Sequence, residues 1–162
     1  METDRIIASI AAGQHAAVGR RQLLDAGVSR SAIDRRVAAG RLVPVHAGVY
    51  LPAGSPPSWR QSVMAALLAA GDGAVVSHRG AAHLLGVPAV EPQVEISVAR
   101  SRSPSTPAIV IHRQELRPSD ITTLDGLPTT RPARTLIDLA AVVTPATLAA
   151  AIDDLLSRRL VT

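Results

Sequence analysis

The side chains best suited to bind a ligand in this chain are arginines, and they gather in one stretch. Residues 15–54 hold six arginines and only two acidic residues, whereas the segments on either side are close to neutral. The formal net charge of +4 therefore arises almost entirely from this stretch. Guanidinium groups donate forked hydrogen bonds to phosphate oxygens and to the major-groove edge of guanine. The stretch is predicted to bind duplex nucleic acid.

The composition excludes several other kinds of chemistry. All 17 basic residues are arginine, so neither a Schiff base nor a P-loop lysine can form. The absence of cysteine rules out disulfides and Cys-ligated zinc, and the five histidines show no paired metal-ligand spacing. No metal and no cofactor are expected. Trp59 and Tyr50 are the only aromatic residues, which disfavours single-stranded nucleic acid, because its bases usually stack on aromatic side chains.

Two short helical patterns and a hairpin must position the arginines. A helix is predicted over residues 18–26, with Gly27 just past its end in the place of a left-handed cap. Ser29 is the expected N-cap of a second helix, which Gly40 terminates. Apolar residues then alternate over 42–51 around a tight turn, which predicts a hairpin. This order is that of a winged helix-turn-helix, in which the second helix enters the major groove.

The helix that follows Ser29 is expected to present its polar side to DNA. Ile33 and Val37 define its buried face, so Arg35 and Ser31 point outward. Arg35 is the best candidate for bidentate contact to guanine; the alternative is a solvated surface arginine. His46, in the turn of the wing, either touches the DNA backbone or adjacent minor groove, or only hydrogen-bonds within its turn. The residues expected to contact DNA are Arg20, Arg21, Ser29, Arg30, Ser31, Asp34, Arg35, Arg36, Arg41 and His46.

The chain is expected to form two domains of α+β class: the winged helix-turn-helix over residues 1–54, and a small α+β domain over 55–162. The second domain is almost neutral, which favours dimerisation or partner binding over a second nucleic-acid site. Helices are predicted at 4–12, 58–71, 80–86, 131–141 and 146–158, with strands at 94–98 and 108–112 on either side of a hairpin tip and a further hairpin at 121–129.

No catalytic arrangement emerges from the polar residues of the second domain, so the protein is not expected to be an enzyme. The candidates are His78, Arg79, His83, Glu95, His112, Asp138, Asp153 and Asp154. Ser77 and His78 are adjacent, and adjacent side chains diverge too much to form a triad by themselves. The Ser77-His78-Arg79 segment is instead expected to cap and orient a helix. No apolar run is long enough to span a membrane and no signal peptide is recognisable, so the expected location is the cytoplasm.

Several ordered blocks resemble the AbiEi-family antitoxins of type IV toxin–antitoxin systems, including their actinobacterial members. The resemblance begins with the segment from Ala17 to Pro52, in particular GVSRSAIDRRVAAGRLVPVHAGVYL at residues 27–51. It continues through VSHRGAA at 76–82, EISV at 95–98, GLPTT at 126–130 and RTLIDLA at 134–140, and so covers nearly the whole chain.

The resemblance implies a transcriptional repressor that binds an operator near its own promoter and counteracts a nucleotidyltransferase-like toxin encoded beside it. By position, Ser29–Arg41 would be the recognition helix with its exit, and Val43–Leu51 the wing. A homodimer or two adjacent sites is expected, since one small module rarely reaches operator-level specificity. Two alternatives remain: a protein-interaction module that binds a toxin without binding DNA, and the targeting part of a larger nuclease-like protein.

Overall fold

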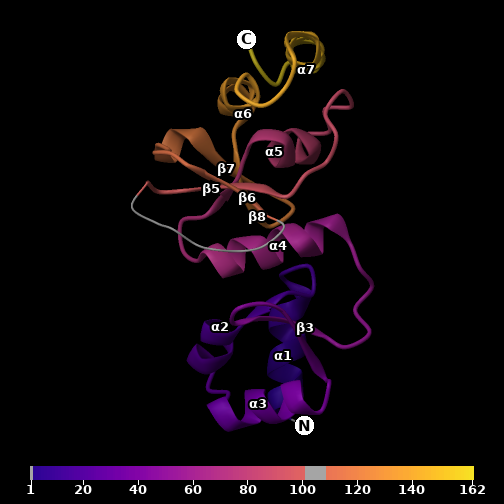
Figure 1. Cartoon of the computed structure of the whole chain (residues 1–162), viewed down its shortest axis with the longest axis vertical. Coiled ribbons are helices and arrows are strands. Elements are labelled where there is room, and N and C mark those ends of the chain that lie inside the picture. The colour runs from indigo at the N-terminus through magenta and orange to yellow at the C-terminus, as the bar shows by residue number, and fades with distance from the viewer. Residues whose placement is uncertain (1, 101–108) are drawn as a thin grey trace. The chain divides into compact units, whose positions relative to one another are not determined.

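The computed structural model describes residues 2–100 and 109–162, which separate by their internal contacts into two compact units. The described residues up to Asp72 belong to unit 1, and those from Gly73 onward belong to unit 2 (Figure 1).

Unit 1 is a winged helix-turn-helix followed by one more helix. Its elements are α1 (Glu2–Ala12), β1 (Val18–Gly19), α2 (Arg20–Asp25), α3 (Arg30–Ala38), β2 (Leu42–His46), β3 (Val49–Pro52) and α4 (Trp59–Ala70). The strands form an antiparallel sheet in the order β1-β3-β2. One apolar core joins α1, α2 and α3 to the sheet, with Leu23, Ile33 and Leu42 fully buried in it. This core fixes the orientation of α3 against the wing.

The turn between α2 and α3 forms as the sequence predicts. Gly27 adopts a φ of 85°, a left-handed conformation that glycine takes without strain. Ser29 then caps α3, because its hydroxyl accepts a hydrogen bond from the Ala32 amide at 3.3 Å. Gly40, with a φ of 66°, lies just beyond the helix and leads into the wing.

The start of α2 differs from the prediction, which was wrong for residues 18 and 19. These residues form β1, which pairs with Tyr50 and Val49 of the wing. Both are buried, and Val18 belongs to the core. A strand of two residues has no periodicity of its own, and only its partner strand defines it.

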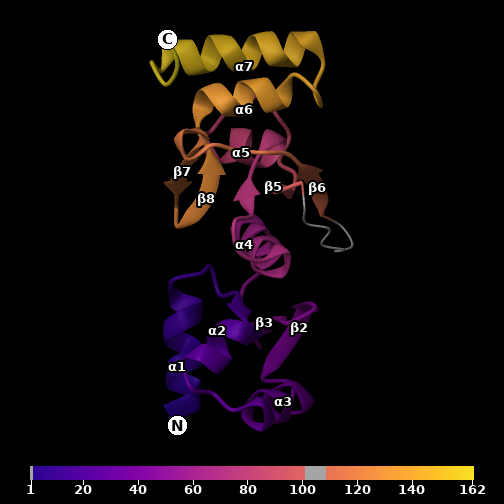
Figure 2. The same cartoon turned by 90° about the vertical axis from the view of Figure 1, so that its left-hand side faces the viewer.

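Within the described residues, unit 2 is a mixed five-stranded sheet with three α-helices and a short 3-10 helix. Its elements are β4 (Val75–Val76), α5 (His78–Leu84), β5 (Glu95–Val98), β6 (Val110–Arg113), the short 3-10 helix η1 (Pro118–Asp120), β7 (Ile121–Leu124), β8 (Leu127–Thr130), α6 (Pro132–Leu139) and α7 (Pro145–Ser157). The strand order is β6-β5-β4-β8-β7. Helix α6 packs against both α5 and α7, and Figure 2 shows α6 and α7 side by side. Leu139 and Leu155 are fully buried in the core that these helices share.

Two predicted hairpins of unit 2 have different outcomes. The β7–β8 hairpin is confirmed, and its turn places Asp125 and Gly126 at φ values of 50° and 77°. The strands β5 and β6 were expected to flank a hairpin tip, but they pair in parallel, with Glu95 opposite Val110. The hairpin expectation was therefore wrong. Its tip, RSRSPSTP at residues 100–107, lies outside the described residues except for Arg100.

The predicted α+β class, with a winged helix-turn-helix first, is confirmed. The domain division at residue 54 stays a prediction; in the structure α4, which follows that point, packs on the three strands of unit 1. Among the described residues, no helix is long and apolar enough to cross a membrane.

Candidate nucleic-acid interface

Helix α3 exposes the residues that the helical wheel places outward. Ala32 and Ile33 are buried, while Ser31, Asp34 and Arg35 are exposed on the opposite side. Ala38 continues this exposed side one turn later. The outward side of α3 thus offers a forked donor, a hydroxyl, a carboxylate and a methyl group, which are the chemical types that read base edges in a major groove.

Three of the predicted arginines are exposed and carry no counter-ion. Among the residues that the structure describes, Arg30, Arg35 and Arg41 form no ion pair. Arg30 opens α3, Arg35 lies on its exposed side, and Arg41 follows its end. Their positive charges are therefore available to an external anion without the breaking of an internal pair.

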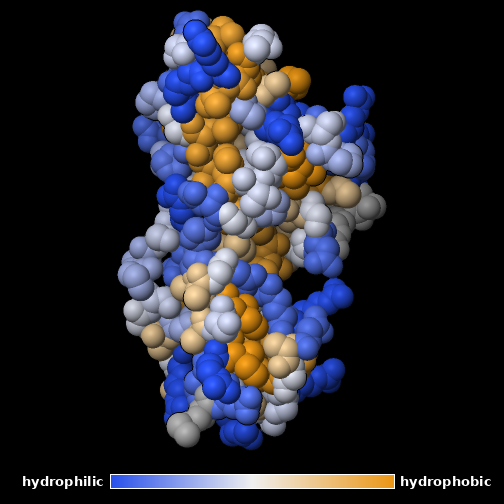
Figure 3. Space-filling view, turned by 180° about the vertical axis from the view of Figure 1, so that it is seen from behind, coloured by the Kyte–Doolittle hydropathy of each residue, from blue (hydrophilic) through white to orange (hydrophobic). Residues whose placement is uncertain are grey.

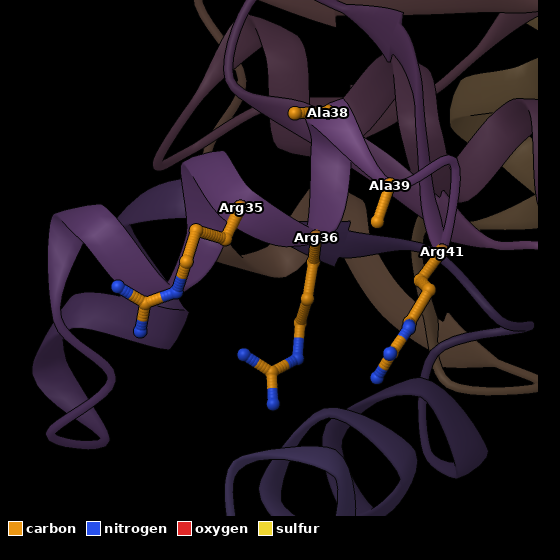
Figure 4. Close-up of a pocket in the computed structure, with 5 residues that line it drawn as sticks. All are labelled: Arg35, Arg36, Ala38, Ala39 and Arg41. Carbon is orange, nitrogen blue, oxygen red and sulfur yellow. The ribbon is translucent and has the colours of Figure 1, made fainter.

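An open hollow lies beside the C-terminal half of α3. It has a volume of about 610 Å³ and is lined by Arg35, Arg36, Ala38, Ala39 and Arg41. Figure 4 shows the three arginine side chains extending toward the same side. The two alanines add no bulk to the wall, so the hollow is a shallow, positively charged surface that suits a phosphate-bearing ligand.

Arg36 has a structural partner that the sequence did not reveal. Its Nε and Nη2 donate to the two carboxylate oxygens of Asp4 at 2.9 and 3.1 Å, and its Nη1 donates to the Ala32 carbonyl. The hydrogen bonds from Arg36 lower the pKa of Asp4 to about 2. The side chain of Arg36 is only 15% exposed. This arginine ties α3 to α1, and its guanidinium is already engaged.

Arg20 is also engaged within unit 1. Its Nη1 donates to Asp34 at 2.9 Å and to the Tyr50 hydroxyl at 3.0 Å. These two partners, Asp34 first, raise the pKa of Arg20 further above its ordinary value. Because Arg20 begins α2, Asp34 lies in α3 and Tyr50 lies in β3, the trio holds both helices of the motif against the wing.

Two further predicted residues lie at the edges of this surface. Arg21 is exposed and approaches Asp25 at 3.8 Å and Asp72 at 3.5 Å, contacts that solvent weakens. His46, at the end of β2, is partly buried, and this burial lowers its pKa, so it is neutral at pH 7. A neutral imidazole can donate a hydrogen bond but adds no charge to the surface.

Unit 2 holds a separate, buried polar cluster around Glu95. One carboxylate oxygen accepts from the Arg79 amide at 2.6 Å, and the other accepts from the Arg79 guanidinium at 2.9 Å, with His112 Nε2 at 3.7 Å. Burial by itself raises the pKa of Glu95, but the nearby His112 ring and the hydrogen bond from the Arg79 amide outweigh it, so the net pKa is lowered. Glu95 thus caps α5, a role that the sequence assigned to the Ser77-His78-Arg79 segment.

The Ser77 hydroxyl makes no capping hydrogen bond and instead joins a chain of polar side chains. Ser97 donates to Ser77 at 2.7 Å, and Ser77 lies 2.8 Å from His78 Nδ1. The His78 ring stacks on His112 with 3.4 Å between ring centroids. Burial, then the charge of His112, lowers the pKa of His78 to about 4, so its ring is neutral at pH 7.

The same series of hydrogen-bonded polar side chains continues to Gln114, the residue after β6. Gln114 donates to Ser97 at 2.7 Å and accepts from Arg134, which also donates to Asp138 at 2.9 Å. Of the eight polar candidates in the sequence, this cluster brings together His78, Arg79, Glu95, His112 and Asp138. Within the described residues, no group of three or more acidic or histidine side chains is arranged to hold a metal ion.

Two family models match the chain. One, described as a transcriptional regulator and AbiEi antitoxin, matches residues 5–53, and the other, described as the AbiEi antitoxin C-terminal domain, matches residues 65–161. Both families are regulatory rather than enzymatic. No curated protein shows a significant match to the chain. Because the second match alone covers more than half of the chain and the first covers the winged helix-turn-helix, the chain belongs to the AbiEi family of antitoxins and transcriptional regulators.

Proposed function

We propose that this protein binds a specific duplex DNA sequence and thereby represses its own operon. The observation that carries the proposal is a set of three exposed arginines, Arg30, Arg35 and Arg41, on and beside the recognition helix, which form no ion pair with any residue that the structure describes. Such groups gain ion pairs and release counter-ions when they meet phosphates, and they lose no internal contact in doing so. The family description, a transcriptional regulator, supports the same function.

Each cationic residue has a distinct role in this proposal. Arg35 and Ser31 read base edges in the major groove, while Arg30 and Arg41 bind phosphates at either end of α3. Arg20 and Arg36 act indirectly, because their hydrogen bonds to Asp34 and Asp4 set the position of α3.

The remaining members of the predicted set contribute at the margin of the interface. Arg21 adds charge beside the backbone, and His46 contacts DNA from the wing. Ser29 shapes the start of α3 through its cap and does not read a base.

The test is a binding titration by fluorescence anisotropy. Labelled duplexes carry either the region upstream of the protein's own gene or the same bases in scrambled order, and the salt concentration is varied. Arg35→Ala is expected to weaken binding to the upstream duplex by about 1–3 kcal/mol and to reduce its preference over the scrambled one. Arg30→Ala and Arg41→Ala should weaken binding to both duplexes and lower the salt slope by about 1 each.

Arg5→Ala is the matched control, because Arg5 is an exposed arginine of the same unit that lies on α1. It removes the same charge and should change binding far less than Arg35→Ala. Equal effects of the two substitutions would show that only net charge matters, and a wild-type protein that binds neither duplex would refute the proposal.

The antitoxin part of the proposal assigns a protein partner to unit 2. Its large exposed apolar residues are Ile137 on α6, Leu156 on α7 and Leu160 just beyond α7, and apolar side chains gather on this part of unit 2 (Figure 3). We propose that unit 2 binds a nucleotidyltransferase-like toxin or a second copy of the chain. Co-purification with the product of the adjacent gene, and sedimentation of the protein alone, distinguish these two partners. Both proposed partners are contradicted if the protein sediments as a monomer and its expression does not rescue growth inhibited by the toxin.

A further inference from the structure

Asp34 is an unusual residue to expose on a helix that faces DNA. It lies in the middle of α3, between Ser31 and Ala38 on the exposed side, and its side chain is 61% exposed. A carboxylate at this position repels phosphates and therefore weakens binding to any DNA sequence. Its presence is understandable if it either holds the fold together or makes a favourable contact with a base.

Within the part of the chain that the structure describes, one of the two carboxylate oxygens of Asp34 has a hydrogen-bond donor. Oδ1 accepts from Arg20 at 2.9 Å, and the same guanidinium nitrogen donates to the hydroxyl of the buried Tyr50. Arg20 therefore both offsets the charge of Asp34 and fixes its orientation. No hydrogen bond to Oδ2 occurs within the described part of the chain. A fixed, exposed acceptor thus remains on the outward side of α3.

The pattern of donors in the major groove identifies what such an acceptor can recognise. Amino groups occur there only on cytosine (N4) and adenine (N6). In adenine the amino group lies beside the N7 acceptor of the same base, which repels a second acceptor, whereas cytosine carries no major-groove acceptor of its own, and the O6 acceptor beside its amino group belongs to the paired guanine. A carboxylate therefore favours cytosine over adenine, and it is repelled by the carbonyl oxygens of guanine and thymine.

We propose that Asp34 selects cytosine at one position of the DNA site by accepting a hydrogen bond from the N4 amino group through Oδ2. This inference rests on the proposed DNA-binding function. It makes Asp34 a specificity-determining residue whose effect on total affinity is small or unfavourable, in contrast to Arg35. Arg20 acts as a positioning residue, because it holds the carboxylate in one orientation.

The experiment is selection of bound duplexes from a library with a randomised site, followed by sequencing. Wild-type protein should enrich cytosine at one position by about tenfold over the other bases, the lower part of the range for a base contact, since a single oxygen is available. Asp34→Ala should lose this enrichment while the other positions keep theirs, and it should bind unselected DNA more tightly. Asp34→Asn should shift the preferred base from cytosine to adenine, because an amide pairs with adenine N6 and N7.

Asp25→Ala is the matched control, since Asp25 is an exposed carboxylate of the same unit that lies on α2. It should raise the affinity for unselected DNA through charge alone and leave every base preference unchanged. Circular dichroism verifies that each variant is folded.

Two outcomes would overturn the inference, and they differ in what else they overturn. If the wild type selects a sequence and both Asp34 variants select the same one at every position, Asp34 only holds Arg20, and the DNA-binding function stands. If the wild type binds the library but enriches no base, or does not bind it, the proposed function fails together with this inference.

Discussion

Removal of the Arg79 side chain tests whether the polar cluster of unit 2 is a paired and necessary part of its fold. Glu95 is 1% exposed, and its two oxygens accept from the Arg79 amide and the Arg79 guanidinium. The substitution Arg79→Ala keeps the first hydrogen bond and deletes the second. One oxygen of a buried carboxylate is then left without its guanidinium donor, with the His112 ring nitrogen at 3.7 Å.

The expected cost follows from this geometry. Breaking a buried ion pair by removal of one partner costs about 3–5 kcal/mol, because the other charge stays buried. The Arg79 side chain is 30% exposed, so water can partly replace it, and we expect about 3 kcal/mol, the lower end of that range. Arg79 also donates to the Val142 carbonyl, which follows α6, so its loss should loosen the contact between α5 and that segment as well.

Hydrogen exchange by mass spectrometry measures this cost where it arises. Peptides that cover α5 and β5 report the free energy of opening in unit 2, while Trp59 fluorescence reports unit 1 in the same chain. Arg131→Ala removes an exposed guanidinium whose one hydrogen bond within the described residues goes to the Ile121 carbonyl, and it should cost less than about 1 kcal/mol.

A double-mutant cycle separates the pair from general loss of packing. In a Glu95→Gln background the buried group is neutral, so the additional cost of Arg79→Ala should fall to about 1 kcal/mol. The reasoning is refuted if Arg79→Ala costs no more than Arg131→Ala, or if its cost is the same with glutamate and with glutamine at position 95.

Three other expectations concern separate parts of the chain. Arg36 lowers the pKa of Asp4 to about 2, so the stability that this pair gives unit 1 is present above the ordinary pKa of 3.8 and is lost as the pH falls toward 2. Thermal unfolding followed by Trp59 fluorescence should therefore give different midpoints for wild type and Asp4→Asn at pH 6, and the two midpoints should converge near pH 2. Gly80→Ala should destabilise unit 2 by about 1–3 kcal/mol, because the added Cβ would lie 3.0–3.1 Å from two backbone carbonyl oxygens and a valine methyl, whereas Gly13→Ala meets one atom at 3.8 Å and should cost less in chemical denaturation. The pKa of His78 is lowered to about 4, so its NMR titration should have a midpoint near pH 4. The stability of unit 2 should fall as the pH drops from about 6.5 toward 4, because the unfolded chain binds the proton at a higher pH than the folded chain does. A midpoint near 6.5 would contradict the burial of His78.

The winged helix-turn-helix could be predicted from the sequence because its signals are local. The glycine after α2, the serine cap of α3 and the alternating residues of the wing each act within a few positions, and all three are confirmed. The hairpin around Asp125 and Gly126 was predictable for the same reason, since its turn requires two consecutive residues with positive φ.

Features that depend on residues far apart in the chain were not predictable. The ion pair between Asp4 and Arg36 joins positions 32 residues apart, and no periodicity signals it. The strand β1 exists only because β3 lies beside it, and β5 and β6 were mistaken for a hairpin because their apolar patterns are the same for parallel and antiparallel pairing.

Which arginines are engaged in internal ion pairs could not be predicted for the same reason. The charge of each was evident from the sequence, but an acidic partner on another element decides whether its guanidinium is engaged. Arg20 and Arg36 have such partners, whereas Arg35 has none among the described residues.

The most direct test of the central claim, that the exposed side of α3 lies against duplex DNA, is an NMR titration of the isotope-labelled protein with the upstream duplex. The claim predicts that amide and arginine side-chain signals of Arg30, Ser31, Asp34, Arg35 and Arg41 shift on binding, and that the shifts shrink together as salt is raised. A complex that forms while these signals stay unchanged would contradict the claim.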